Sequence, residues 1–468
     1  MADIVVMGAG ICGSASATLL AEDGHDVVVL ERDRAGLPPS GPEAWRGWSR
    51  HGVAQFRGPH WLHPGGRAVL DSHLPQVKNA LAAEGALTYN MLGPLPPPIA
   101  GSGPQPGDER FTTLTARRPV LEQAVAGVAE KVADVRRGVA VAELLTGPSD
   151  IAGVPHVAGV RTATGERITA DLVVDATGRR SVLPGRLDAI GARPVIEEAE
   201  SSGFFYYSRY FHEPGGPPPA RAGLVSPLGT ISLLYLPADN QTWSVTVHMS
   251  SRDTAMREVR RTDVWTNLVS SCPLHAHLLE GEPITDVLAN SGTVDRYRRF
   301  VVDGLPVATG IVAVGDAWAC TNPSSGRGMT LGLRHAVRLR DAVRAASGAP
   351  GRLVEMFDAT TEAELVPWYR ATLSVDRDRQ AEIDALIDGR PVPPPGDETA
   401  SRWRDLAVAM AYDPDLFRGF LDTIAVLDLP ETVLDRPGLF DRVRTIARSE
   451  PRLQLPGPTR EELLELVA

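Results

Sequence analysis

Apolar and polar positions in the first part of the chain follow the order of a strand, a helix and a second strand. Residues 4–7 form a short apolar run, residues 14–21 are mostly small, and residues 27–30 form a second apolar run. Short apolar runs bounded by glycine are typical of buried parallel strands, and the segment between them is long enough for a helix. The pattern predicts a strand–helix–strand unit at the start of an α/β domain.

Two later apolar runs have the same character and also end in glycine. Residues 171–175 lead to a turn at Gly178, and residues 311–314 lead to Gly315 and Asp316. A glycine-rich loop follows the second run and leads into a predicted helix. Because the carboxyl ends of parallel strands meet at one edge of a sheet, we expect all three glycine turns to face one site.

The rest of the chain divides into a strand-rich middle and a helical end. Further strands are predicted at residues 135–145, 157–164, 166–168, 204–211, 222–236, 242–249 and 294–300. Helices are predicted at 67–81 with a break at Pro75, at 115–133 and at 252–279. Residues 316–345 are predicted to run through a loop into a helix, and most of 351–468 is predicted to be helical, with a proline-rich break at 391–396. The Pro/Gly-rich stretch 94–107 is expected to be a surface excursion, and the basic run 296–299 a solvated strand face.

The first turn has the spacing of a dinucleotide-binding fingerprint. Gly8 permits the tight turn, Gly10 lets the backbone approach a pyrophosphate, and Gly13 lets the helix pack close to the strand. The helix N-terminus offers free N–H groups to the phosphates. Glu31 ends the second strand about 20 residues on, where a carboxylate can bind ribose hydroxyls. This context predicts dinucleotide binding; the alternative is a glycine-rich turn in another kind of α/β domain.

Composition narrows the classes of function. The net charge of −11 argues against nucleic acid as a partner, because nothing concentrates positive charge on one face. Cys12, Cys272 and Cys320 are too far apart for a disulfide framework or a zinc motif, which favours a reducing compartment. A strand that begins almost at Met1, and the lack of an apolar run of membrane-spanning length, predict a cytoplasmic protein without membrane insertion.

Together these motifs resemble the class A flavoprotein monooxygenases, the para-hydroxybenzoate hydroxylase superfamily. The resemblance lies in the three glycine turns, with Pro323 and Gly326 to Gly328 after the third, and it covers roughly residues 1–345. A closer similarity is to bacterial polyether-type epoxidases and related tailoring oxygenases. It rests on Arg50-His51-Gly52-Val53-Ala54-Gln55 with His60, Arg118-Pro119-Val120-Leu121-Glu122, Asp175-Ala176-Thr177-Gly178-Arg179 and Gly326-Arg327-Gly328-Met329.

The resemblance implies FAD as the cofactor and NAD(P)H as the electron donor. It implies that Asp316 binds the ribityl chain, that Gly328 and Met329 present N–H groups to the isoalloxazine, and that Pro323 lies against the flavin. Asp175 departs from the family's simplest pattern, because two residues separate it from the glycine. The implied cofactor-binding residues are Gly8, Gly10, Ile11, Cys12, Gly13, Glu31, Arg32, Arg50, Arg118, Asp175, Gly178, Gly315, Asp316, Pro323, Gly326, Gly328 and Met329.

The implied fold is α/β: a glutathione-reductase-type FAD-binding Rossmann domain with an inserted antiparallel β-sheet substrate domain and a helical C-terminal region. We expect residues 1–70, 108–190 and 291–345 to form the FAD-binding domain. Residues 71–107 and 191–290 are then the substrate-binding domain, and residues 346–468 the helical region. The implied activity is hydroxylation or epoxidation of a hydrophobic or aromatic small molecule with O₂, in secondary-metabolite biosynthesis. Because the cofactor supplies the oxidising power, no catalytic triad is required.

No catalytic residue can be assigned from the pattern, and no metal ligand is predicted. Pro323, Tyr206 and His60 are candidates for positions near the flavin or the substrate, and a covalent bond between a histidine and the flavin is an alternative for His60. Strand periodicity places Phe204, Tyr206, Ser208 and Tyr210 on one face of residues 204–211, the face we favour for substrate.

Three other functions stay open from the sequence. One is a flavin-dependent reductase or dehydrogenase acting on alkenes, similar to geranylgeranyl reductases, and another is a non-catalytic nucleotide-binding scaffold. A third is a flavin halogenase, since Trp45 and Trp48 are similar to the tryptophan pair of those enzymes. The flanks of this pair differ, however, and Lys78 is predicted to lie on a surface helix rather than at an active site.

Overall fold

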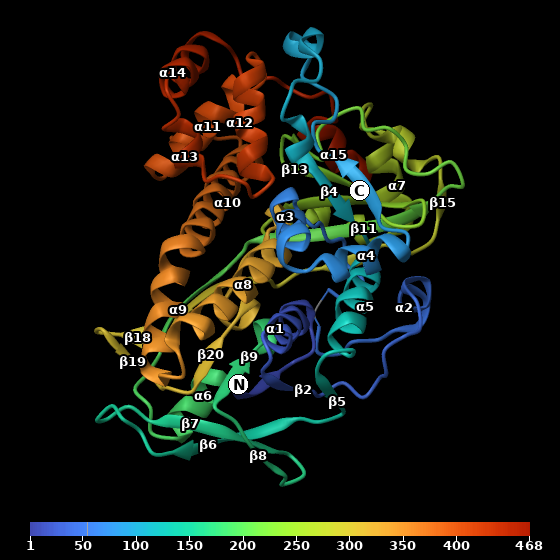
Figure 1. Ribbon diagram of the computed structural model, residues 1–468. Helices are drawn as coiled ribbons and strands as arrows, with labels where there is room; N and C mark the ends of the chain where they lie inside the picture. Colours follow the sequence, from blue (N-terminus) through green and yellow to red (C-terminus); the bar gives the residue numbers. More distant parts are fainter. Residues whose placement is uncertain (54) are drawn as a thin grey trace.

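Five parallel strands form the sheet that carries the three glycine turns (Figure 1). The computed structural model describes residues 1–53 and 55–468; Ala54, part of the Arg50–Gln55 motif, lies outside the described residues. Helix α1 (Ile11–Glu22) joins the first two strands, as the apolar pattern predicts. Across the sheet the order is β20 (Ile311–Ala313), β9 (Leu172–Asp175), β1 (Asp3–Met7), β2 (Asp26–Glu31) and β5 (Asp134–Arg137).

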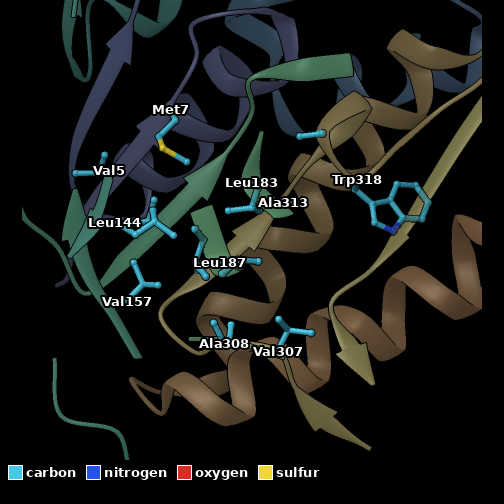
Figure 2. Packing of buried hydrophobic residues seen from close by; sticks show 14 of the residues in the cluster. Val5, Met7, Leu144, Val157, Leu183, Leu187, Val307, Ala308, Ala313 and Trp318 are labelled. Carbon is cyan, nitrogen blue, oxygen red and sulfur yellow. The ribbon is translucent and has the colours of Figure 1, made fainter. Parts of the chain in front are cut away.

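Alternate residues of β1 enter two different cores, because successive side chains of a strand point to opposite faces. Val5 and Met7 join the cluster shown in Figure 2, which includes residues of a small antiparallel sheet. Ile4 and Val6 join a cluster with α1 and α8 on the other face. Both faces are therefore covered, as a parallel sheet requires. The covering elements are β6 (Val141–Gly147), β7 (His156–Thr162), β8 (Arg167–Thr169), α6 (Leu183–Ala189) and α8 (Gly328–Ala346).

A larger antiparallel sheet lies between β9 and β20 in the sequence, as predicted. One of its faces packs in a core with α7 (Thr262–Ser270) and α15 (Arg460–Val467), which returns from the end of the chain. Its strands are β12 (Val225–Leu228), β13 (Ile231–Pro237), β14 (Thr242–Ser250), β11 (Phe204–His212) and β15 (Glu282–Pro283), with β16 (Leu288–Asn290) also paired to β11.

After α8 the chain is mostly helical, as predicted, apart from the proline-rich break between residues 387 and 398 and a non-helical stretch at residues 450–459. Helix α10 (Val366–Ile387) is long and leads from the part with the parallel sheet to a separate group of helices (Figure 1). The preceding helix is α9 (Pro350–Glu364), and the group consists of α11 (Glu398–Ala409), α12 (Pro414–Ile424), α13 (Pro430–Leu434) and α14 (Leu439–Ser449).

The remaining elements connect these parts. Pro75 separates two helices, as predicted, since it starts α4 directly after α3 ends. The bounds are α2 (Gly41–Gly47), α3 (Pro64–His73), α4 (Pro75–Ala83), α5 (Arg118–Ala129), β3 (Leu87–Asn90), β4 (Thr112–Thr115), β10 (Ile196–Ser201), β17 (Val294–Arg299), β18 (Val301–Val302), β19 (Leu305–Pro306) and β21 (Ala319–Cys320).

Three predictions of local structure are wrong. The strand predicted at 135–145 is two strands, β5 and β6, in different sheets, and the helix predicted at 252–279 is mostly short turns around α7. The run 296–299 is not a solvated face, because Arg298 is buried. Its guanidinium bonds Glu197 at 2.7 Å and the carbonyl oxygens of Ala317 and Ser181, so it connects β17 to two glycine turns.

Among the described residues, none of the helices combines the length and the apolar content needed to cross a bilayer.

Candidate functional site

One cavity of about 1800 Å³ extends from the carboxyl edge of the parallel sheet to the antiparallel sheet and the C-terminal helices. Pockets for a single small ligand usually measure about 300–1000 Å³, so this cavity has room for an elongated cofactor and a substrate together. All three glycine turns line it, through Gly10, Gly178 and Gly328. Glu31 and Asp316 line the same cavity, as expected for the two ends of one dinucleotide.

The first turn leaves open space where the fingerprint predicts phosphates. Gly8 has φ +101°, and a Cβ at Gly13 would lie 1.9 Å from the Gly8 carbonyl oxygen, so both positions require glycine. A Cβ at Gly10, by contrast, would meet nothing within 4 Å. No described side chain caps α1, so its first N–H groups are left for a ligand.

The third turn provides a second set of unused polar groups. Helix α8 begins at Gly328 without a side-chain cap among the described residues, and Gly328 and Met329 line the cavity. The Asp316 side chain is 39% exposed, and its ion pair with Arg179 spans 3.9 Å, which leaves the carboxylate free to bind hydroxyls. Two uncapped helix ends with a carboxylate at the same cavity fit the pyrophosphate, the ring and the ribityl chain of FAD.

Cys12 holds the first and third turns together. A Cβ at Gly315 would lie 2.6 Å from the Cys12 sulfur, and one at Gly332 would lie 2.2 Å from it, so the thiol fills the space between two glycines. Burial, and after it the carboxylate of Asp316, raises the pKa of Cys12 to about 12. The side chain is therefore a neutral packing group at the cavity wall.

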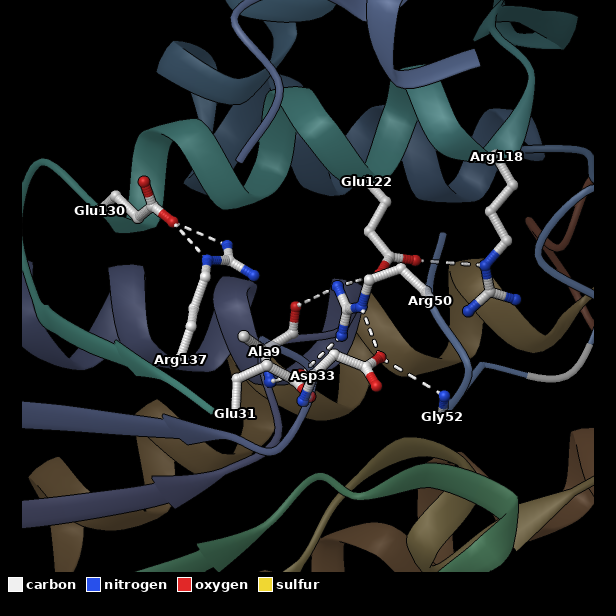
Figure 3. Close-up of polar contacts among 9 residues, drawn as sticks. All are labelled: Ala9, Glu31, Asp33, Arg50, Gly52, Arg118, Glu122, Glu130 and Arg137. Carbon is white, nitrogen blue, oxygen red and sulfur yellow. Dashed lines mark hydrogen bonds and ion pairs between the residues drawn. The ribbon is translucent and has the colours of Figure 1, made fainter. Parts of the chain in front are cut away.

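Arg50 lies at the centre of a buried ion cluster beneath the first turn (Figure 3). Its nitrogens pair with Glu31 at 2.5 Å, Glu122 at 2.6 Å and Asp33 at 3.1 Å. Burial would lower the pKa of Arg50, but the carboxylates of Glu122 and Glu31 outweigh it and the pKa is raised. Arg50 lines the cavity, yet each guanidinium nitrogen is engaged inside the protein, so its evident role is to place Glu31.

The Glu31 carboxylate is also oriented by the backbone. Its Oε2 accepts from the Ala9 N–H at 2.9 Å, and its Oε1 accepts from the Asp33 N–H at 2.9 Å. Glu31 and the adjacent Arg32 both line the cavity. A fixed carboxylate at the end of β2 is the arrangement that the fingerprint predicts for contact with a ribose.

His60 and Arg118 form a second fixed pair on the cavity wall. Arg118 donates to Glu122 at 3.2 Å and to Nε2 of His60 at 2.8 Å, and Nδ1 of His60 donates to the Gly58 carbonyl at 2.9 Å. Since arginine only donates, this fixes the tautomer of the ring. Burial and then Arg118 lower the pKa of His60 to about 3. Both ring nitrogens are engaged, which leaves neither for a covalent bond to flavin or for a metal.

Asp175 does not reach the cavity, contrary to the implied role in cofactor binding. It is fully buried, and Oδ1 accepts from both the N–H and the hydroxyl of Thr177. Oδ2 accepts from the Ser181 hydroxyl at 2.5 Å. The carboxylate therefore shapes the second turn from beneath, while Ala176, Thr177 and Gly178 of that turn line the cavity.

The aromatic strand β11 presents the favoured face to the cavity. Phe204, Tyr206 and Ser208 line it, whereas Tyr207 and Phe211 pack into the core on the other side of the sheet. The Tyr206 hydroxyl donates to Oδ1 of Asn322, in the loop that carries Pro323. Tyr210 turns away from the cavity and contacts Trp45, with the ring centroids 4.9 Å apart.

The residues that suggested a halogenase lie elsewhere. Trp45 and Trp48 are not among the residues lining the cavity, and Trp48 packs against Phe56 and Arg50. Lys78 lies on α4 and pairs with Asp71 at 2.5 Å. Cys320 is buried and packs against the backbone of Val294, and burial raises its pKa to about 11.

The C-terminal helices supply part of the cavity wall that sequence patterns did not indicate. Helix α10 contributes Asp376 and Arg379, and α12 contributes Phe417 and Leu421. The stretch 94–107, expected on the surface, also contributes four residues from Pro94 to Pro97. In the sequence, an acid among the charges of α10 is indistinguishable from one on a solvated helix face, so no local signal could have revealed Asp376.

Comparison with known proteins supports the assignment of the fold. Residues 6–72 match the family described as an NAD(P)-binding Rossmann-like domain. The chain is 28% identical over 449 residues to Protein Rv3254 of Mycobacterium tuberculosis, a match that covers 91% of this chain and 89% of that protein.

Solved structures extend the likeness beyond the first 72 residues. PqsL, a probable FAD-dependent monooxygenase from Pseudomonas aeruginosa, aligns with a TM-score of 0.58 and 18% identity over 83% of this chain and 99% of that one. This chain shares the fold of PqsL. The same fold is found in the flavin-dependent brominase Bmp2, which aligns with a TM-score of 0.58 and 14% identity over 94% of this chain and 99% of that one.

Proposed function

We propose that this protein is an FAD- and NAD(P)H-dependent monooxygenase that hydroxylates or epoxidises a hydrophobic or aromatic small molecule. The observation that supports this most is the single cavity, lined at one end by three glycine turns and at the other by an aromatic strand and apolar helices. Such a cavity brings a dinucleotide and an organic substrate into one enclosure. FAD, when bound and reduced by NAD(P)H, supplies the activation of O₂.

The glycine-turn end binds and orients the cofactor in this proposal. The free N–H groups at the start of α1 hold the pyrophosphate, and Glu31, fixed by Arg50, binds the adenosine ribose. Asp316 binds the ribityl hydroxyls. The N–H groups of Gly328 and Met329 face the pyrimidine edge of the ring, where they stabilise negative charge in the reduced form.

The far end binds the substrate and excludes water. Trp61, Met91, Phe417 and Leu421 belong to one buried apolar cluster, and all four line the cavity. Apolar walls favour a hydrophobic substrate and protect a reactive oxygen donor from water. Tyr206 and its neighbours on β11 and β14 offer hydroxyl groups at the opposite wall, which would orient the oxygen atoms of such a substrate.

Two alternatives predict different chemistry for the same fold. A halogenase would need a residue that directs the halogen, and neither lysine of the chain, Lys78 or Lys131, is among the residues lining the cavity. A flavin-dependent reductase of alkenes would use the same cofactor end but would not need O₂. We therefore favour the monooxygenase, with hydroxylation ahead of epoxidation.

Turnover with and without oxygen separates these functions. The holoenzyme would be incubated with NADPH or NADH and a panel of phenols and polycyclic enols under ¹⁸O₂, and products analysed by mass spectrometry. We expect one ¹⁸O atom per product and no product under anaerobic conditions. Reduced product formed without O₂ would identify a reductase, and a purified chain that never acquires a flavin spectrum with added FAD would contradict both.

A further inference from the structure

Four segments bring buried polar groups together beside the Pro323 loop. Tyr206 from β11 and Asn322 share a hydrogen bond, and both line the cavity. Asp376 from α10 accepts from the Ser324 hydroxyl at 2.7 Å and is only 8% exposed. The Asn322 N–H donates to Asp295 of β17.

Two polar atoms of this cluster have no hydrogen-bond partner among the described residues. They are Nδ2 of Asn322 and Oδ2 of Asp376, and both are buried. The Asn322 side chain nevertheless lies near enough to Asp376 to lower the pKa of its carboxyl. A buried donor or acceptor left without a partner destabilises the folded state. The amide and the carboxyl are therefore expected to satisfy each other with a small adjustment.

The amide of Asn322 can connect Asp376 to Tyr206 by two hydrogen bonds, and the donor and acceptor in each bond depend on the protonation state of Asp376. An amide presents an acceptor oxygen on one side and a donor NH₂ on the other. An ionised Asp376 only accepts, so it holds the NH₂, and the amide oxygen then accepts from Tyr206. A protonated Asp376 can donate to the amide oxygen, and a half-turn of the amide then points the NH₂ at Tyr206.

The direction of this chain decides what Tyr206 offers the cavity. When the tyrosine hydrogen is committed to Asn322, its oxygen lone pairs remain for a ligand that donates. When Asn322 donates to the tyrosine oxygen, the tyrosine hydrogen is free for a ligand that accepts. In both states Tyr206 stays neutral, because burial raises its pKa well above the ordinary value.

We propose that Asp376 is a positioning residue that, through Asn322, sets whether Tyr206 accepts a hydrogen bond from the substrate or donates one to it. The ionised form selects a phenol, an enol or an N–H at this wall, and the protonated form selects a carbonyl. The inference rests on the proposed function in taking this wall as the substrate side of the cavity, but it requires no oxygen transfer.

The charges around Asp376 make it responsive near neutral pH. Burial raises the pKa of Asp376, and the carboxyl of Asp295 raises it too, while the Ser324 hydroxyl and Arg327 lower it. The net result is a pKa of about 7. Burial also raises the pKa of Asp295, to about 6.

The other titratable groups nearby do not change charge in this range. Burial lowers the pKa of Arg327 to about 10, which leaves it cationic at neutral pH. Burial lowers the pKa of His248, whose ring centroid lies 5.5 Å from that of Tyr206, to about 3. Burial also lowers the pKa of His63 to about 3, so both rings stay neutral.

Carbon-13 NMR of the full chain, labelled at Cζ of its eight tyrosines, tests the proposal without substrate. The Tyr206 resonance is identified by its loss in Tyr206→Phe. We expect it to move between pH 5.5 and 8.5 with a midpoint within about one unit of 7. In Asp376→Asn, which cannot ionise, the resonance should stay in place over the same range.

Two further variants make the result decisive. Asp358→Asn removes an acid on α9 whose pKa burial also raises to about 6 but which is not among the residues lining the cavity, and it should leave the Tyr206 titration unchanged. Ser324→Ala removes a donor to the Asp376 carboxylate and should raise the midpoint by about half a pH unit. It replaces Asp376→Asn as the test if that variant does not fold.

Ligand selection gives the functional readout on the FAD-bound protein. The ratio of the Kd of 2-acetylnaphthalene, an acceptor, to that of 2-naphthol, a donor, should rise about tenfold from pH 5.5 to 8.5. A stationary Tyr206 resonance in the wild type, or a titration that persists unchanged in Asp376→Asn, would overturn the proposal. A normal titration in a protein that incorporates no ¹⁸O would instead refute the proposed function and leave this inference standing.

Discussion

The two ends of the cavity are built in opposite ways. At the first turn, Glu31, Asp33 and Glu122 surround one arginine, and every nitrogen of Arg50 is paired. At the Pro323 loop, Asn322 and Asp376 each keep a buried polar atom without a partner. The side chains around Arg50 are paired with one another before any ligand arrives. At the Pro323 loop, by contrast, buried polar atoms are left without a partner among the described residues.

This difference separates holding a cofactor from selecting a substrate. A dinucleotide has the same phosphates and riboses in every turnover, so a saturated, preorganised end suits it. Orientation of a substrate depends on which group donates and which accepts, so an end with unassigned hydrogen bonds can respond to its ligand. Substitutions at the two ends should therefore have different effects on stability and on ligand binding.

The largest effect is expected at the saturated end. Arg50→Met should lower the free energy of unfolding by about 3–5 kcal/mol, because the buried carboxylates of Glu31 and Glu122 and the half-buried carboxylate of Asp33 lose their common partner. Urea denaturation measures the change. Arg136→Met is the matched control, since its partners Asp134 and Glu166 are exposed surface acids and the expected loss is below about 1 kcal/mol. Equal losses in the two variants would mean that the cluster does not behave as one unit.

Smaller effects are expected from substitutions of the glycines in the first turn. One substitution should lower the stability of the fold, and the other should lower the affinity for FAD. Gly13→Ala should cost about 3 kcal/mol of stability, because its Cβ would overlap the Gly8 carbonyl oxygen. Gly10→Ala should fold normally, since its Cβ faces open space, but lower FAD affinity about tenfold by entering the phosphate site. Denaturation and FAD titration of both variants check this. Wild-type affinity in Gly10→Ala would place the phosphates elsewhere.

The smallest change in stability is expected beside the Pro323 loop, where Asp376→Asn should stabilise the protein. The pKa of Asp376 is raised by burial to about 7, so the folded chain keeps a proton that the unfolded chain has released. Stability contributed by this group is present below about pH 4 and is lost as pH rises towards 7. Asp376→Asn should therefore be about 2 kcal/mol more stable than wild type at pH 8, and nearly equal at pH 4.

Urea midpoints at pH 4 and pH 8 measure this gain. Asp263→Asn serves as the control, because Asp263 is exposed and a hydrogen bond from Arg261 lowers its pKa, so its removal should bring no gain at pH 8. A destabilised Asp376→Asn at pH 8 would show that the ionised carboxylate is needed for folding, contrary to the account of an adaptable end.

The part of the fold that could be predicted from sequence is the part determined by local rules. Gly8 and Gly13 are required by contacts within the first strand–helix unit, so their spacing reveals the turn. The antiparallel strand β11 was evident from its length and its aromatic alternation. By contrast, Arg298 was misread as solvated, because its burial depends on residues more than a hundred positions away in the chain.

The same distinction between local patterns and tertiary contacts applies to the residues of the site. Glu31, Asp316 and Gly328 follow strand ends or begin a helix, and the structure brings all three to one cavity. The role of Arg50 was predicted only as proximity to the cofactor, because its three partners come together through tertiary structure. Asp376 was missed entirely, since its distinctive property is burial against a loop 52 residues earlier.

The central claim is that one FAD molecule lies along this cavity from the start of α1 to the start of α8. A crystal structure of the chain with added FAD tests it most directly. The account predicts the pyrophosphate against Gly10 and Ile11, the adenosine ribose at Glu31 and the isoalloxazine at Gly328 and Met329. A flavin bound outside this cavity, or reversed within it, would contradict the account.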